Sequence, residues 1–119
     1  MGQSLAERVA ASDDLELAGI WKRGADLGEI VRKSDVLIDF SLPEAADAVI
    51  TAALQHNVPL VCGVSGLSAS QMQAIADAAG SIPVVYDRNM SLGIAVLENL
   101  VREAVRQLGS NFEIRIHET

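Results

Sequence analysis

Cysteine, aromatic residues and long apolar runs are scarce in this chain of 119 residues, and each shortage excludes a class of protein. Cys62 is the single cysteine, so an intrachain disulfide is excluded and no Cys/His cluster with metal-ligand spacing is present. No apolar run approaches the roughly 20 residues of a membrane span. The N-terminus also lacks the basic and then apolar order of a secretory signal. We therefore expect a cytoplasmic protein without a metal site or membrane contact.

The net charge and the sizes of the side chains further limit the kinds of partner and fold that are expected. Acidic residues outnumber basic ones, which gives a formal net charge of −7 at pH 7. Such a surface repels a phosphodiester backbone, so nucleic acid is disfavoured as a partner. Hydrophobic residues make up 50% of the chain and aromatic residues only 3%. Small aliphatic cores are typical of parallel sheets covered by Ala-rich helices, and this length suits one domain.

Helical and extended patterns alternate along the whole chain. Apolar side chains recur at helical spacing in residues 1–11, 25–33, 43–57, 68–79 and 94–108. Short β-rich runs occupy residues 15–21, 36–40, 60–64, 83–86 and 112–116. Capping boxes are expected at Ser41–Glu44 and Ser68–Gln71. This order predicts an α/β fold with a Rossmann-like, doubly wound parallel sheet. Because the chain opens on a helix and not on a strand, the first strand of that fold is expected to be absent.

Polar segments with glycine or serine follow four of the expected strands. They are residues 21–24, 39–41, 63–66 and 87–91. In open α/β sheets, ligands bind beyond the carboxyl ends of the strands. Glycine permits close backbone approach and helix N-termini favour anions, so the four segments together suit a phosphate-bearing nucleotide. The same residue types also form ordinary turns and caps, and that alternative stays open for each loop taken singly.

Lys22 and Arg23 close the expected second strand, at the position that faces the adenosine ribose in nucleotide-binding sheets. Two cations there would attract a 2′-phosphate, whereas a solvated basic pair is an equally good interpretation. His56 and His117 have no arrangement that indicates catalysis. Asp39 and Asp87 could approach one another at neighbouring strand ends as a carboxylate pair, but capping and turn roles are the favoured interpretation of both.

In their order and spacing, these loops resemble the N-terminal domain of the bacterial dihydrodipicolinate reductases, also called 4-hydroxy-tetrahydrodipicolinate reductases. Met1-Gly2 is similar to the tail of the family's Gly-Arg-Met-Gly turn, and Ile38–Ser41 to its Asp-Phe-Ser/Thr segment. Gly63–Gly66 is similar to the family's Gly-Thr-Thr-Gly loop, and Asn89–Gly93 to its Asn-Phe/Met-Ser stretch. The resemblance spans the whole chain.

The resemblance implies a reductase that transfers hydride from NADPH or NADH to a cyclic imine dicarboxylate, on the route to diaminopimelate and lysine. It implies a cofactor site formed by Met1, Lys22, Arg23, Phe40, Ser41, Gly63, Val64, Ser65, Arg88, Asn89, Met90 and Ser91. Lys22 stands where many family members carry an acid, which indicates that NADPH is accepted or preferred. Val64 replaces a threonine hydroxyl of the family.

The resemblance also implies a longer enzyme with a small-molecule substrate. Family members continue into a His-His-x-x-x-Lys segment that protonates and binds the substrate, so no catalytic residue is assigned in this chain. We expect residues 1–111 to form a partial NAD(P)-binding domain and residues 112–119 to begin the path toward a catalytic domain. The chain alone is expected to bind nucleotide weakly and to be inactive. The alternatives are a non-catalytic nucleotide- or CoA-binding module and a structural fragment that self-associates, and a homo-oligomer is one possible assembly.

Overall fold

The computed structural model describes residues 1–22, 24–113, 115 and 117, which fall into two units. The first unit is Met1–Arg88 and the second is Asn89–Thr119. The first unit contains three strands and four helices within its described residues, whereas the second consists mainly of one long helix.

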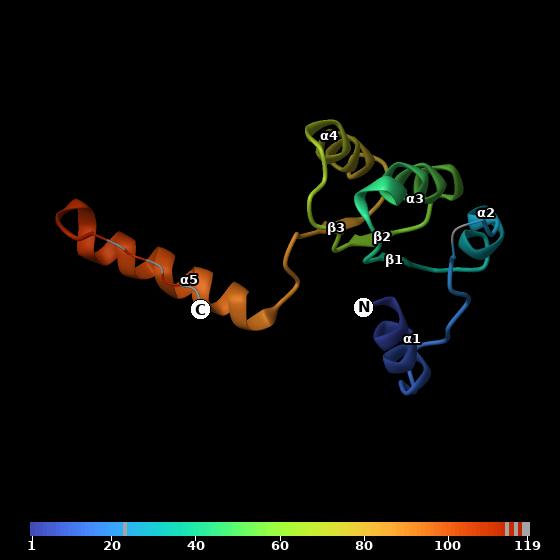
Figure 1. Cartoon of the computed structure of the whole chain (residues 1–119), viewed down its shortest axis with the longest axis horizontal. Coiled ribbons are helices and arrows are strands. Elements are labelled where there is room, and N and C mark those ends of the chain that lie inside the picture. The colour runs from blue at the N-terminus through green and yellow to red at the C-terminus, as the bar shows by residue number, and fades with distance from the viewer. Residues whose placement is uncertain (23, 114, 116, 118–119) are drawn as a thin grey trace. The chain divides into compact units, whose positions relative to one another are not determined.

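Three short parallel strands form the centre of the first unit (Figure 1). They are β1 (Leu37–Asp39), β2 (Leu60–Cys62) and β3 (Val84–Tyr86), paired in the order β1-β2-β3. A helix connects each strand to the next, as parallel pairing requires. The α/β class and the Rossmann-like parallel sheet that the sequence predicts are therefore confirmed.

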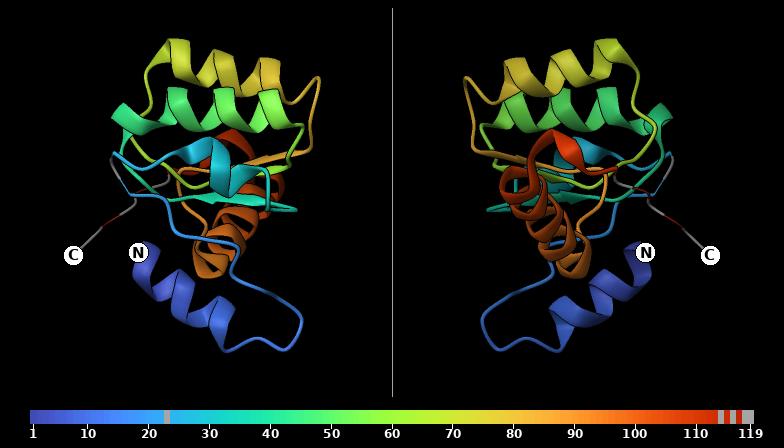
Figure 2. Two further views of the ribbon diagram at one scale, coloured as in Figure 1. Left: turned by 90° about the vertical axis from the view of Figure 1, so that its right-hand side faces the viewer. Right: turned by 90° about the vertical axis from the view of Figure 1, so that its left-hand side faces the viewer.

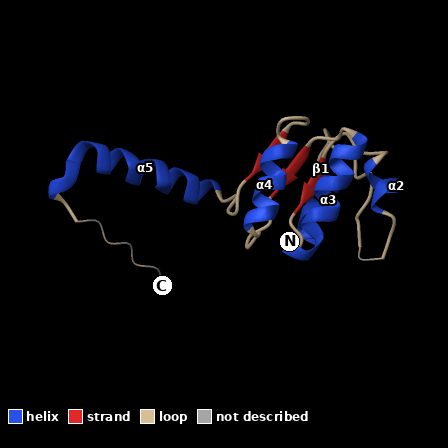
Figure 3. Ribbon diagram, turned by 90° about the horizontal axis from the view of Figure 1, so that it is seen from above, coloured by secondary structure: helices blue, strands red, loops and turns tan. Residues whose placement is uncertain are grey.

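The helices lie on both sides of this sheet. α3 (Pro43–His56) and α4 (Ala69–Ala78) lie side by side over one face (Figures 1 and 3). The short α2 (Leu27–Val31) packs beside α3, and α1 (Gly2–Ala10) lies on the opposite side of the sheet (Figure 2). This layering places the carboxyl ends of the strands at one edge, with the starts of α3 and α4 beside them.

The core of the first unit lies between the sheet and the α3–α4 layer. Leu60 and Cys62 are almost fully buried on β2, while Ala46 and Ala53 are fully buried on α3. Alanine at these helix positions allows a close approach of α3 to the strands. The side chains of alternate strand residues point to the other face, where Ile38 and Val85 are exposed.

The two predicted capping boxes have different outcomes. At α4, the Ser68 hydroxyl accepts from the Gln71 N–H at 3.2 Å and the Gln71 side chain accepts from the Ser68 N–H at 3.0 Å, which confirms the prediction. At α3 the prediction is wrong, because Leu42 is the N-cap residue and provides no side-chain cap. Ser41 lies one residue too early and instead donates its N–H to Asp39 Oδ1 at 2.8 Å.

The predicted strand at residues 15–21 is also wrong. This segment has no strand pairing, and its side chains Leu15, Leu17 and Ile20 are exposed. A strand requires a hydrogen-bonded neighbour, whereas a cavity separates this segment from β1. The segment is consequently extended without belonging to the sheet.

The second unit is dominated by α5 (Leu92–Leu108), followed by a short 3₁₀ helix, η1 (Gly109–Asn111). Ser91 caps α5 by accepting from the Ile94 N–H at 3.4 Å. The helix stops at Gly109, whose φ of +69° favours glycine, and this stop is as the sequence predicts. Residues 114 and 116 of the strand expected at 112–116 lie outside the described residues, so that strand stays a prediction.

Candidate functional site

The carboxyl ends of β1 and β2 bring two of the predicted site segments into contact. Phe40 follows β1 and Gly63 follows β2, and the Gly63 N–H donates to the Asp39 carbonyl at 2.8 Å. A Cβ atom added to Gly63 would lie 2.6 Å from Phe40 Cζ, which is closer than real Cβ contacts. The phenyl ring therefore lies against the bare backbone of Gly63, and a larger residue at this position would require the ring to move.

The third strand ends at the same edge. The Asp87 N–H, directly after β3, donates to the Cys62 carbonyl at 3.2 Å. The exposed Arg88 follows it. Because adjacent parallel strands end together, residues 40–41, 63–65 and 87–88 follow one another along a single rim of the sheet.

Within the glycine loop, the side chains of Val64 and Ser65 lie in opposite environments. Val64 is 1% exposed and belongs to the core, so this residue can meet a ligand only through its backbone. Ser65 is exposed, as is Ser41 in the neighbouring loop. The loop thus presents backbone groups and serine hydroxyls at the rim, and the valine that replaces a threonine of the family serves the core.

The start of α3 has features that suit an anion. Leu42 supplies no side-chain acceptor to the first-turn amides, and the positive end of the helix dipole lies at this rim. Glu44 in the first turn partly offsets that charge. The buried Gln71 fixes the position of this helix end, because its side-chain nitrogen donates to the Pro43 carbonyl at 2.7 Å and to Asp47 Oδ2 at 3.3 Å. The sequence pattern predicts only a capping role for Gln71 and does not indicate this second contact.

Trp21 connects the basic turn to the same rim, and it is not among the residues that the sequence predicts for the site. It lines a small cavity of about 200 Å³ together with Ser41, Leu42 and Ala45. Its indole N–H donates to the Ala25 carbonyl at 3.0 Å, which closes the turn that contains Lys22. The Lys22 side chain is exposed, and Arg23 lies outside the described residues. The available signal was that the only tryptophan of the chain immediately precedes the basic pair.

The remaining predicted site residues lie near chain or unit boundaries. Met1 is 79% exposed and is the N-cap residue of α1. Asn89, Met90 and Ser91 begin the second unit, where Asn89 Oδ1 accepts from the Ser91 N–H at 3.0 Å. That turn positions Ser91 to cap α5. A cofactor role for these four residues stays a prediction.

Cys62 lies beneath this rim, on β2. Burial raises the pKa of its thiol, the nearby Asp39 carboxylate raises it further, and a hydrogen bond from the Val64 backbone opposes both effects. The thiol is therefore protonated at neutral pH and is a weak nucleophile. Among the described residues, no three His, Cys, Asp or Glu side chains come together as a metal site, and no helix is long and apolar enough to cross a membrane.

Comparison with known proteins gives consistent matches. Residues 1–90 match the family described as "Dihydrodipicolinate reductase, N-terminus". Over 99% of its length, the chain is 40% identical to the 4-hydroxy-tetrahydrodipicolinate reductase of Zymomonas mobilis, of which it covers 49%. The corresponding enzyme of Rickettsia rickettsii is 35% identical over the whole chain, with 51% of that enzyme covered. That of Campylobacter jejuni is 36% identical over 99% of the chain, with 48% covered. The chain thus spans about half the length of the curated relatives it matches.

Proposed function

Since the chain belongs to the dihydrodipicolinate reductase family, we propose that its first unit holds the pyridine nucleotide of a 4-hydroxy-tetrahydrodipicolinate reductase. The proposed reaction of the whole enzyme is hydride transfer from NADPH or NADH to a cyclic imine dicarboxylate, within diaminopimelate and lysine biosynthesis. The nucleotide supplies the hydride when it is bound, and the protein orients it.

The observation that carries this proposal is the packing of Phe40 on Gly63 at the shared rim of β1 and β2. This contact joins two loops that are 23 residues apart in the sequence, and the half-buried Phe40 ring forms an apolar surface at the rim. The exposed hydroxyls of Ser41 and Ser65 and the uncapped start of α3 flank the contact. Polar groups and open helix amides beside a flat apolar surface suit a ligand with phosphates and aromatic rings.

Individual roles follow from this arrangement and from the family resemblance. Gly63, Val64 and Ser65 would approach the nicotinamide end through their backbone. The same role for residues 88–91 rests on the family resemblance alone. Phe40 and Ser41 would lie against the cofactor, and Met1 would border the pyrophosphate. Lys22, with Arg23, would attract the 2′-phosphate of NADPH, because a charge-assisted hydrogen bond to phosphate is stronger than a neutral one.

Trp21 provides a direct test of binding, since it is the only tryptophan and it borders Ser41. Titration with NADPH and with NADH is expected to quench Trp21 emission and to transfer its excitation energy to the reduced nicotinamide. Trp21→Phe should remove that transfer while leaving binding, measured by calorimetry, in place. If neither nucleotide changes Trp21 emission or gives a binding heat at millimolar concentration, the proposed site is wrong.

Lys22→Glu tests the assignment of the 2′-phosphate. We expect the Kd for NADPH to rise about tenfold or more, because the variant replaces an attraction of about 1.5–3 kcal/mol by repulsion. The Kd for NADH should stay the same or fall. Arg32→Glu is the matched control, since it makes the same charge change at another exposed residue of the first unit. Equal losses for both nucleotides, or equal effects of the two variants, would contradict the assignment.

A further inference from the structure

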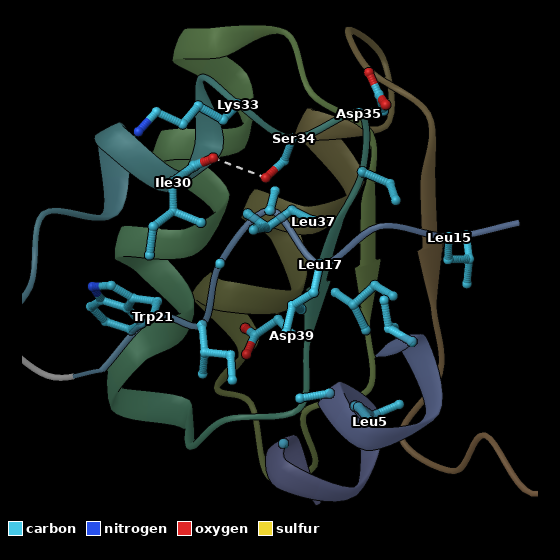
Figure 4. Close-up of a pocket in the computed structure, with 18 of the residues that line it drawn as sticks. Leu5, Leu15, Leu17, Trp21, Ile30, Lys33, Ser34, Asp35, Leu37 and Asp39 are labelled. Atoms are coloured by element: carbon cyan, nitrogen blue, oxygen red, sulfur yellow. Dashed lines mark hydrogen bonds between the residues drawn. The ribbon is translucent and has the colours of Figure 1, made fainter. Parts of the chain in front are cut away.

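Charged residues of the first unit lie at both ends of β1. Lys33 lies where β1 begins (Figure 4), and Glu29 neutralises it in an ion pair of 2.9 Å. Asp39 and Trp21 lie toward the other end of β1, which is the rim (Figure 4). Lys22 follows Trp21, and the proposed function gives it the 2′-phosphate of NADPH. The β1 end of the rim therefore has its own cation.

A second cation lies at the β3 end of the rim. Arg88 is the only cationic residue in the loops that follow the three strands, which are residues 40–42, 63–68 and 87–88. Its side chain is exposed and forms no ion pair with any acid in the described part of the chain. The guanidinium is therefore available to an anion from solution.

Backbone hydrogen bonding places Arg88 beside the glycine loop. The Asp87 N–H donates to the Cys62 carbonyl at 3.2 Å, so residue 87 is still aligned with the end of β2. Gly63 directly follows Cys62, and Arg88 directly follows Asp87. Because adjacent strands lie about 4.8 Å apart, the chain leaves the sheet at positions 63 and 88 as close neighbours. A long side chain at position 88 can consequently reach a ligand that lies over the glycine loop.

The two helix N-termini at the rim differ in what they offer to an anion. At α4, Ser68 and Gln71 form a complete capping box, so the first-turn amides already have acceptors. At α3, no side chain caps the first turn. Phosphate is therefore attracted to the α3 side of the rim. On the side of β2 and β3, Arg88 is the only cationic side chain that the loops after the strands provide.

The ligand group expected beside Arg88 is not a phosphate. The proposed function brings the nicotinamide to the loop at residues 63–65, and the reduced nicotinamide ring is uncharged, whereas the oxidised ring is positive. A guanidinium gains no ion pair from the first and is repelled by the second. The other reactant that must lie against the nicotinamide is, in the proposed reaction, a dicarboxylate. A guanidinium binds a carboxylate through two parallel N–H···O bonds.

We propose that Arg88 binds a carboxylate of the substrate and thereby selects an anionic hydride acceptor. This inference rests on the proposed function, because that function defines the nicotinamide end of the site. The rim is then divided by charge. Lys22 attracts the phosphate of the nucleotide at the β1 end, and Arg88 attracts the carboxylate of the second reactant at the β3 end. The two hydrogen bonds of the guanidinium also restrain the rotation of the acceptor over the nicotinamide, which a single point charge does not.

The probe is pyridine-2,6-dicarboxylate, a flat ring with two carboxylates, titrated into the full 119-residue chain with NADPH at several times its Kd. Pyridine-2,6-dicarboxamide has the same shape without the charge and is the reference at constant ionic strength. NMR follows the side-chain Nε–H signal of Arg88. We expect a Kd on the order of 1–10 mM for the dicarboxylate and a Kd at least about tenfold higher for the diamide, because the charge-assisted hydrogen bonds are lost. Equal affinities of the two ligands would overturn the proposal.

Variants of Arg88 test whether this side chain is the source of the preference. Arg88→Ala should abolish the preference for the dicarboxylate over the diamide, and Arg88→Lys should keep part of it, because lysine retains the charge but not the planar pair of donors. Arg32→Ala is the matched control, since Arg32 is also exposed but precedes β1. It should leave the preference unchanged. A preference that survives in Arg88→Ala, or that Arg32→Ala removes as well, shows the proposal to be wrong.

Nucleotide binding separates this inference from the proposed function. If Arg88 contacts a phosphate of the cofactor instead, Arg88→Ala should raise the Kd for NADPH and for NADH at least about tenfold without any dicarboxylate present, and the proposal is overturned. If NADPH binds but about 50 mM dicarboxylate leaves the Arg88 signal unchanged, this inference alone fails. A chain that binds neither nucleotide contradicts the proposed function, and this inference with it.

Discussion

At the scale of single residues, the rim depends on the absence of a side chain at position 63. Phe40 occupies the space that a Cβ atom would fill, so the aromatic ring and the glycine form one feature. From the sequence, both residues are recognisable as loop residues after strands. The contact between the two residues cannot be predicted from the sequence, because it depends on the register of β1 and β2.

Gly63→Ala should therefore destabilise the first unit by about 1–3 kcal/mol, as overpacking in a close-packed region does. Urea unfolding of the full chain measures the change. Gly2→Ala is the matched control, since nothing lies within 4 Å of a Cβ at that position. Adding Phe40→Ala to Gly63→Ala should recover part of the loss, and strictly additive effects would show that the two residues do not interact.

Cys62 gives a prediction about pH. Its thiol pKa is raised in the folded chain above the ordinary value of 9.0, so the unfolded chain ionises first as the pH rises. The corresponding stability is present in full below pH 9 and is lost as the pH rises from there through the folded pKa. The free energy of unfolding should thus fall more steeply above pH 9 in the original chain than in Cys62→Ala. Parallel pH profiles of the two proteins, measured by urea unfolding, would contradict this.

At the scale of elements, a capping box was predictable where its two residues bond only to each other, and not where tertiary contacts engage one of them. Ser68 and Gln71 satisfy one another locally, and the pattern correctly predicts α4. Ser41 matches the same pattern, but its N–H donates to Asp39 Oδ1, and Leu42 takes its place as the N-cap residue of α3. Tertiary placement of the strand thus overrides the local signal.

Gln71 links two elements and offers a test at this scale. Gln71→Ala removes the buried donor to the Pro43 carbonyl as well as half of the capping box, and we expect it to cost about 1–3 kcal/mol of unfolding free energy. Gln73→Ala is the control on the same helix, since Gln73 is exposed and its side chain donates to Asp77 in the next turn. Its effect should stay within about 0.5 kcal/mol. Similar losses for both variants, measured by thermal or urea unfolding, would show that Gln71 acts only through the helix itself.

At the scale of the whole molecule, the alternation of strands and helices was predictable because apolar periodicity is a local property. Whether residues 15–21 belong to the sheet was not predictable, because a strand requires a hydrogen-bonded neighbour and a cavity separates this segment from β1. The rim residues were predictable as loops, since parallel strands end together. The place of Trp21 beside Ser41 and the bond from Gln71 to the Pro43 carbonyl were not predictable, because each depends on contacts between segments distant in the sequence.

The spacing of the paired strands has a consequence for how the chain folds. Leu37 pairs with Leu60, and Leu60 pairs with Val84, at separations of 23 and 24 positions. The entropy lost in closing the two crossovers is therefore nearly equal, so chain length gives neither pairing a kinetic advantage. The difference lies in the crossover helices, because α3 brings two fully buried alanines against the strands whereas α4 brings one. We therefore expect the β1-α3-β2 crossover to form first and β3 to condense onto it.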